Sequence, residues 1–137
     1  KILNKYMDIQ FITGDKKGFK ITKKRIDDMK FNVALVSTVK RVEWLEKRFN
    51  LKEIIYMGDG IFDYLTMKKV NYSIAPANAD IFCKKNANYI TTRSGGDRAV
   101  SEACLHILRK FYKVNPLLGN FPKDVNFSGG WKSWKLL

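Results

Sequence analysis

The sequence predicts an α/β fold in which a parallel, doubly wound sheet is covered by helices on both faces. Between residues 8 and 112, apolar runs of strand length alternate with amphipathic segments of helix length. Glycine or proline closes several of the apolar runs, as is common at strand ends. Strands that are joined through helices run parallel, because the helical crossover returns the chain to the same end of the sheet.

Five strands and five helices are expected in alternation. The strands are predicted at residues 8–13, 32–36, 53–57, 72–75 and 88–91. The helices are predicted at residues 18–29, 40–49, 61–70 and 79–86, and from Asp97, the expected N-cap, to about Tyr112. Ligands of such folds bind beyond the carboxyl ends of the strands, so the residues after each strand are the candidates for a site.

The composition is that of an ordinary globular domain. The chain has 137 residues, of which 45% are hydrophobic and 28% charged, and this excludes a disordered tail, a collagen and a disulfide scaffold. No apolar run approaches the roughly 18–20 residues that cross a bilayer, and no secretory segment is visible. We therefore expect a cytoplasmic protein without a membrane partner. Cys83 and Cys104 fit no metal-ligand spacing and are expected to be reduced, buried thiols.

We expect one α/β domain over residues 1–114 and a distinct aromatic tail over residues 115–137. Asn115-Pro116 ends the last predicted helix, and further glycines and prolines follow. The tail contains Phe121, Phe127, Trp131 and Trp134, which is too aromatic for a disordered segment. We expect it to pack on the domain or on a neighbouring subunit.

The chain is strongly basic. It has 26 Lys and Arg against 13 Asp and Glu, a net charge of +13, and residues 1–114 carry +11 of it. Such a surplus attracts nucleic acid, acidic proteins or phosphorylated substrates. The alternative is a generally solvated basic surface, because the lysines are scattered and form no long block.

The strongest candidate for a site is Gly58-Asp59-Gly60 with Asp63. Asp59 directly follows a predicted strand, and Asp63 lies four residues later at the start of the next helix. Carboxylate oxygens at a strand end suit Mg²⁺, which uses few protein ligands and retains water for a phosphate. The alternative is a tight turn at Asp59 and a favourable helix-start charge at Asp63.

Three further strand ends carry residues that suit an anionic substrate. Thr13-Gly14 offers a hydroxyl and backbone N–H groups to phosphate oxygens, and the ammonium of Lys40 can reach a phosphate at the same sheet edge. Arg93 and Arg98 flank a glycine pair and can bind a substrate carboxylate or a neighbouring subunit's phosphate site. Each feature also has an ordinary interpretation. Thr13-Gly14 is also typical of a common turn, and Lys40 of a solvated lysine in a first helical turn. The two arginines are also typical of a basic loop in which Asp97 caps the next helix.

In this order, the motifs resemble those of the haloacid dehalogenase (HAD) superfamily of phosphohydrolases. Over residues 8–112 the chain looks most like the capless branch that includes 3-deoxy-D-manno-octulosonate 8-phosphate phosphatases, and like the C-terminal domain of acylneuraminate cytidylyltransferases. Thr13 matches the family's second motif, Lys40 the third, and Gly58-Asp59 with Asp63 the fourth. Residues 75–80 and 89–100 resemble the branch's later turn, closing strand and glycine pair.

Two positions depart from the family pattern. The family's first motif, Asp-x-Asp-Gly, carries the nucleophile and the general acid, and no Asp-x-Asp occurs in this sequence. The chain therefore looks like a HAD-like core whose first strand is missing. Asp15 stands where the capless branch often has Arg after Thr-Gly or Ser-Gly, which leaves the sugar-phosphate substrate open.

The resemblance implies a Mg²⁺-dependent phosphomonoesterase that acts on a small phosphorylated metabolite, such as a sugar-acid phosphate. An Asp from an upstream segment would form an aspartyl-phosphate, and Asp59 would hold Mg²⁺. Thr13 and Lys40 would hold the phosphoryl oxygens, while Asp63 would orient Lys40 or a metal-bound water. Capless enzymes tend to be tetramers, so the resemblance also implies a homo-oligomer, with the tail as the candidate contact.

The alternative function is a catalytically silent HAD-like module that serves binding or assembly. The missing nucleophile, the +13 charge and the aromatic tail favour this hypothesis, for instance in a ribonucleoprotein. The charge allows a nucleic-acid partner, which the motifs do not favour. Phosphate release separates the two hypotheses, because only the enzyme releases it.

Overall fold

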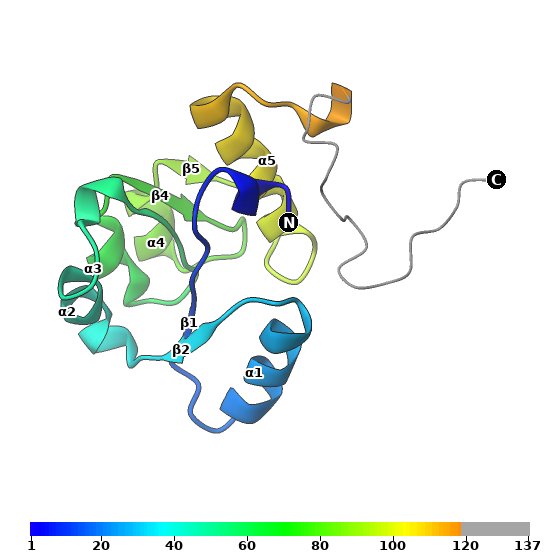
Figure 1. Ribbon diagram of the computed structural model, residues 1–137. Helices are drawn as coiled ribbons and strands as arrows, with labels where there is room; N and C mark the ends of the chain where they lie inside the picture. Colours follow the sequence, from blue (N-terminus) through cyan, green and yellow to red (C-terminus); the bar gives the residue numbers. More distant parts are fainter. Residues whose placement is uncertain (119–137) are drawn as a thin grey trace. The chain divides into compact units, whose positions relative to one another are not determined.

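The computed structural model describes residues 1–118 of the chain, and these residues form two compact units. Lys1–Leu35 and the described residues from Leu105 on make the first unit, and Val36–Cys104 make the second. In Figure 1 the blue N-terminal segments and the orange C-terminal ones belong to the first unit, and the green ones to the second. The predicted domain boundary at residue 114 stays a prediction.

The first unit contains a β-α-β crossover. β1 (Phe11–Thr13) and β2 (Val33–Leu35) pair in parallel and are joined by α1 (Phe19–Asp28). Ile26 is the buried residue of α1, and the rings of Phe11 and Phe31 lie 5.5 Å apart. The unit also includes the 3₁₀-helices η1 (Leu3–Lys5) and η4 (Pro116–Leu118) and the later part of α5 (Ala99–Tyr112).

The second unit is built on a three-stranded parallel sheet in the order β3-β4-β5. The strands are β3 (Ile55–Met57), β4 (Tyr72–Ala75) and β5 (Tyr89–Ile90). The helices are α2 (Arg41–Glu46), α3 (Asp63–Met67), α4 (Ile81–Asn86) and the start of α5, with 3₁₀-helices η2 (Thr38–Lys40) and η3 (Leu51–Glu53). The central strand β4 pairs with a strand on each side and is the most buried of the three, and its residues Ser73, Ile74 and Ala75 have no exposed surface.

The predicted α/β class and the parallel pairing of the strands are confirmed. The strands nevertheless form two sheets, β1-β2 and β3-β4-β5, where the sequence predicted one. In the described part of the chain, β3 is therefore an edge strand, and both strands of the first sheet have an open edge. Such edges expose backbone groups to which a further strand can bind.

Several element boundaries differ from the predicted ones. The strand expected from Asp8 begins at Phe11, and the helix expected over 40–49 begins as η2 and ends at Glu46. Asp97 is not the N-cap of α5, because this helix begins at Ala99, two residues later.

No helix in the described residues has the length and apolar character that a membrane span requires.

Glu102 on α5 fixes the chain just after β5. Its carboxylate accepts hydrogen bonds from the backbone N–H of Thr92 (2.8 Å) and Arg93 (3.0 Å), and from the hydroxyls of Thr92 (3.0 Å) and Tyr89 (2.9 Å). Burial opposes ionisation, but these four donors outweigh it and lower the pKa of Glu102 from the ordinary 4.5 to about 2. The ionised carboxylate thus holds the end of β5 against α5.

We expect Glu102 to contribute stability at neutral pH that is lost in acid. Because its pKa is lower in the folded chain, the contribution is present above about pH 4.5 and declines as the pH falls toward about 2. Urea unfolding at a series of pH values should show a smaller acid-induced loss in Glu102→Gln than in the wild type. Equal pH slopes in the two proteins would contradict this assignment.

Candidate active site at the end of strand β3

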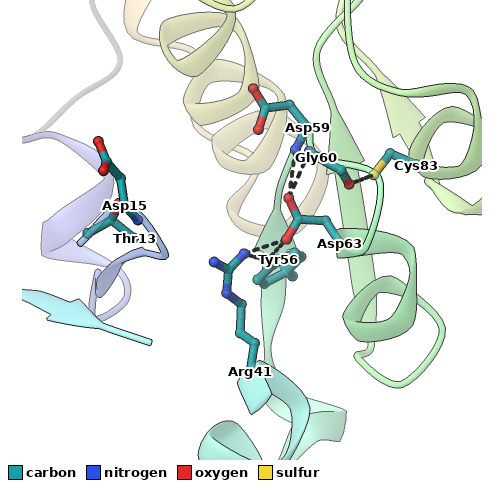
Figure 2. Close-up of polar contacts among 8 residues, drawn as sticks. All are labelled: Thr13, Asp15, Arg41, Tyr56, Asp59, Gly60, Asp63 and Cys83. Atoms are coloured by element: carbon teal, nitrogen blue, oxygen red, sulfur yellow. Dashed lines mark hydrogen bonds and ion pairs between the residues drawn. The ribbon is translucent and has the colours of Figure 1, made fainter. Parts of the chain in front are cut away.

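Asp59 stands in a turn whose backbone is fully hydrogen-bonded. Its N–H donates to Oδ2 of Asp63 (3.1 Å), and its carbonyl accepts from the N–H of Asp80 (2.9 Å). The next residue, Gly60, donates its N–H to the same Asp63 oxygen (2.9 Å) and accepts at its carbonyl from the Cys83 thiol (2.8 Å). The Asp59 side chain is exposed, and no hydrogen bond or ion pair to it is found among the described residues. Figure 2 shows this carboxylate pointing away from Asp63.

Asp63 is the buried centre of the cluster in Figure 2. Only 4% of the residue is exposed, and its Oδ1 accepts from the guanidinium of Arg41 and from the hydroxyl of Tyr56 (2.6 Å). The same Arg41 nitrogen, Nη1, also donates to the Tyr56 oxygen (2.8 Å). Burial and then the Asp63 charge raise the pKa of Tyr56, so its hydroxyl remains a donor. Both Asp63 oxygens are thus occupied by protein donors.

The cation beside Asp63 is Arg41, whereas the sequence had placed Lys40 in this role. Lys40 is exposed and ends η2, while Arg41 begins α2 with 7% of its surface exposed. Sequence reasoning missed Arg41 and Tyr56, although a signal existed for Arg41. It lies four residues before the buried Leu45, and thus on the same helix face. The phosphate contact predicted for Lys40 stays a prediction.

Arg41 also has an unused donor. Its Nε is buried and has no hydrogen-bond partner among the described residues. A buried donor without a partner costs about 1–3 kcal/mol, so such groups are uncommon in folded proteins.

We expect Asp63→Asn to destabilise the protein by about 3–5 kcal/mol, because it leaves the Arg41 charge buried without its partner. Lys40→Gln, at the neighbouring exposed position, should change the free energy of unfolding by less than about 0.5 kcal/mol. Denaturant unfolding of both variants measures the difference. An Asp63→Asn protein as stable as Lys40→Gln would contradict the role of the buried ion pair.

Gly58 allows the close approach of Asp63 to the turn. A Cβ at residue 58 would lie 2.7 Å from both Cγ and Oδ2 of Asp63, whereas a Cβ on Gly60 would lie 3.5 Å from Oδ2. The first distance is a clash and the second is an ordinary contact.

The thiol of Cys83 on α4 also holds this turn. Burial and then the Asp63 charge raise the pKa of Cys83 to about 11, so its thiol stays protonated and donates to the carbonyl of Gly60.

Alanine substitutions at the two glycines test this difference in space. Gly58→Ala must displace Asp63 and should cost about 1–3 kcal/mol of folding free energy. Gly60→Ala should cost less and should leave the Tyr56 environment unchanged. Thermal unfolding and near-ultraviolet circular dichroism report the two effects. Equal effects of the two substitutions would mean that the contact between Gly58 and Asp63 is not tight.

Thr13 and Asp15 lie in the first unit, after β1. The hydroxyl oxygen of Thr13 accepts from the N–H of Asp15 (3.2 Å), which leaves the hydroxyl hydrogen able to donate to a ligand. The Asp15 carboxylate accepts from the N–H of Gly18 (2.8 Å), at the start of α1. Asp15 thus holds the turn that leads into this helix, a role that the sequence comparison with the capless branch did not reveal. Gly14 between them is exposed.

Arg93 and Arg98 lie after β5, as the sequence predicted. Both are exposed, and both guanidinium groups face the carboxylate of Asp97, at 3.9 Å and 3.7 Å. These distances exceed a normal hydrogen bond, so neither arginine is firmly paired.

The donor set suits a metal that needs few protein ligands. Among the described residues there is no group of three or more His, Cys, Asp or Glu that could hold an ion. The exposed carboxylate of Asp59 fits Mg²⁺, which keeps most of its coordination for water and phosphate. Asp63 fits less well, because both of its oxygens already accept hydrogen bonds.

Comparisons with known proteins support the family resemblance. The chain is 38% identical over 53 residues to 3-deoxy-D-manno-octulosonate 8-phosphate phosphatase from Escherichia coli strain K12, which covers 39% of this chain and 28% of the relative. No family model matches the chain.

Solved structures extend the similarity over most of the fold. The enzyme of the same name from Yersinia pestis has a TM-score of 0.66 and 27% identity, and the match covers 78% of this chain and 60% of that one. The enzyme from Moraxella catarrhalis, solved with magnesium, phosphate and a KDO molecule, has a TM-score of 0.68 and 23% identity, over 79% and 64% of the two chains. The chain therefore spans less than two thirds of these relatives, and it has the Rossmann-like fold of HAD-type hydrolases.

Proposed function

We propose that this chain supplies the Mg²⁺- and phosphate-binding part of a HAD-type phosphomonoesterase for a small phosphorylated metabolite of the sugar-acid class. The Asp59 turn carries the proposal, because it presents an exposed carboxylate after a parallel strand on a backbone fixed by hydrogen bonds. The names of the relatives above, which are phosphatases of a sugar-acid phosphate, support the substrate class.

Asp59 would hold Mg²⁺, with water and the substrate phosphate in the remaining positions. When bound, the ion neutralises charge on the phosphoryl oxygens as the phosphorus is attacked. Asp63 would act mainly by fixing the turn. Direct binding of Mg²⁺ by Asp63, which the spacing of the two carboxylates predicted, would require its oxygens to give up hydrogen bonds that they accept here.

The remaining phosphate contacts would come from hydroxyl and cationic groups. Among the described residues no acceptor is found for the hydroxyl hydrogen of Thr13, and Gly14 follows it at the end of β1 with a backbone N–H to offer. Lys40, which is exposed at the end of η2, keeps its predicted role. These donors would hold the phosphoryl oxygens and so orient phosphorus for attack.

The nucleophile would come from a further strand. In the family, the carboxylate of an Asp-x-Asp strand attacks phosphorus, the substrate alcohol leaves, and water then hydrolyses the aspartyl-phosphate. These 137 residues contain no Asp-x-Asp, whereas β3 and the first sheet have open edges. A strand that carries this motif elsewhere in the native protein would find backbone donors and acceptors at these edges.

The cytoplasmic location expected from the composition and the homo-oligomer that the resemblance implies remain part of this proposal. The candidate contact, the tail over 115–137, lies for the most part outside the described residues. The relatives named above give no support to the alternative of a silent binding module.

The proposal predicts Mg²⁺-dependent phosphate release by the native protein from phosphorylated sugar acids. Asp59→Asn should reduce kcat/KM by about 100-fold or more, because the metal loses its protein ligand. Chelation with EDTA should abolish release, and added Mg²⁺ should restore it.

Asp28→Asn is the matched control, since Asp28 is an exposed carboxylate at the end of α1. It should retain wild-type activity. Phosphate release that persists in Asp59→Asn or in excess EDTA would overturn the proposal.

A further inference from the structure

The loop between β5 and α5, residues 92–98, is held rigidly although it lies on the surface. We call it the arginine loop. The Glu102 carboxylate accepts from the backbone of Thr92 and Arg93 at its beginning, as described above. At the other side, the N–H of Gly95 donates to Oδ1 of Asn78 (2.7 Å). The carbonyl of Arg93 accepts from the Thr91 hydroxyl (2.6 Å) and from the N–H of Ala77 (3.2 Å).

The two arginines on this loop have capacity for a ligand. The side chains of Arg93 and Arg98 are 46% and 73% exposed, and they share one long contact partner, Asp97. No hydrogen bond from either guanidinium is found in the part of the chain that the structure describes. A rigid loop thus presents two guanidinium groups, which bind carboxylates well because of their planar, paired donors.

The arginine loop and Asp59 contact the same turn, residues 76–80. Asp80 donates its N–H to the Asp59 carbonyl, while Ala77 and Asn78 bond to the arginine loop. Both therefore lie at the carboxyl edge of the three-stranded parallel sheet, where ligands of such folds bind. A substrate whose phosphate binds next to Asp59 would extend along this turn toward the arginines.

We propose that Glu102 and Asn78 are positioning residues, which fix the arginine loop so that Arg93 and Arg98 bind a carboxylate of the phosphorylated substrate. This inference rests on the proposed function, because it assumes a phosphate at Asp59. It adds the residues that distinguish a phosphorylated acid from a phosphorylated neutral sugar.

The sign of the effect at Glu102 separates positioning from simple electrostatics. Glu102 is itself negative, so Glu102→Gln makes the loop more positive and would by charge alone tighten the binding of an anion. The glutamine amide, however, cannot accept all four hydrogen bonds and brings N–H donors close to the backbone donors of Thr92 and Arg93. Positioning therefore predicts weaker carboxylate recognition.

The experiment compares the affinity of the native protein, with Mg²⁺ present, for two probes. 6-Phosphogluconate carries a carboxylate in addition to its phosphate, and glucose 6-phosphate does not. We expect the wild type to prefer 6-phosphogluconate by about three- to tenfold in Kd, a typical gain from exposed ionic hydrogen bonds. Arg93→Gln and Arg98→Gln should reduce this preference, and Glu102→Gln should reduce it as well.

Two further variants control for folding and for charge. Asn78→Ala removes the second anchor of the loop at an exposed position, and it should also reduce the preference. Glu46→Gln removes one negative charge from an exposed site on α2 and should leave the preference unchanged. Thermal unfolding of each variant identifies a temperature at which all are folded.

Three results would overturn the inference. Equal affinities of the wild type for the two probes would contradict it while leaving the proposed function intact. Unchanged or increased preference in Glu102→Gln and Asn78→Ala would show that the two residues do not position the loop. Failure of the wild type to bind either probe with Mg²⁺ would overturn the proposed function, and this inference with it.

Discussion

The candidate site depends on one buried carboxylate. Asp63 lies at the start of α3, and its two oxygens join three parts of the second unit: Arg41 on α2, Tyr56 on β3 and the backbone after β3. Burial of an ionised group is costly unless it is paired and fully hydrogen-bonded, and this group meets both conditions. Asp63 takes up the backbone donors of the turn, and the side chain of the neighbouring Asp59 is exposed, with no partner among residues 1–118. Asp63 thus fixes the backbone of Asp59, and the exposed carboxylate of Asp59 is available to a ligand.

The same division between fixed backbone and free side chain occurs at the end of β5. Glu102 binds the backbone after that strand, and the arginines beyond it are exposed. Rigid backbone at a binding site lowers the entropy cost of ordering the site when ligand binds. A strongly basic chain with these fixed donors suits an anionic metabolite.

The sequence predicted the α/β class, the order of the elements and the place of Asp59, because strand and helix periodicity and the residues after a strand are local features. Other features depend on contacts between distant residues and could not be predicted in this way. The division into two sheets follows from which strands pair, and apolar periodicity does not contain that information. The choice between Lys40 and Arg41 is different, because the spacing to Leu45 was a local signal: only one of two adjacent cations can share the helix face of a buried leucine. The hydrogen bonds from the backbone of Thr92 and Arg93 to Glu102 likewise join residues ten and nine positions apart, which no sequence motif indicated.

The central claim is that Asp59, held in place by Asp63, is the ligand for a divalent ion. Binding of paramagnetic Mn²⁺ to the isotopically labelled protein tests it directly, because Mn²⁺ prefers the same oxygen ligands as Mg²⁺ and broadens nearby amide signals. The account predicts that the amide signals of residues 59, 60 and 80 broaden first in the wild type. In Asp59→Asn the amide signals at the same three positions should stay sharp. Broadening that persists in Asp59→Asn, or that centres on residues away from this turn, would contradict it.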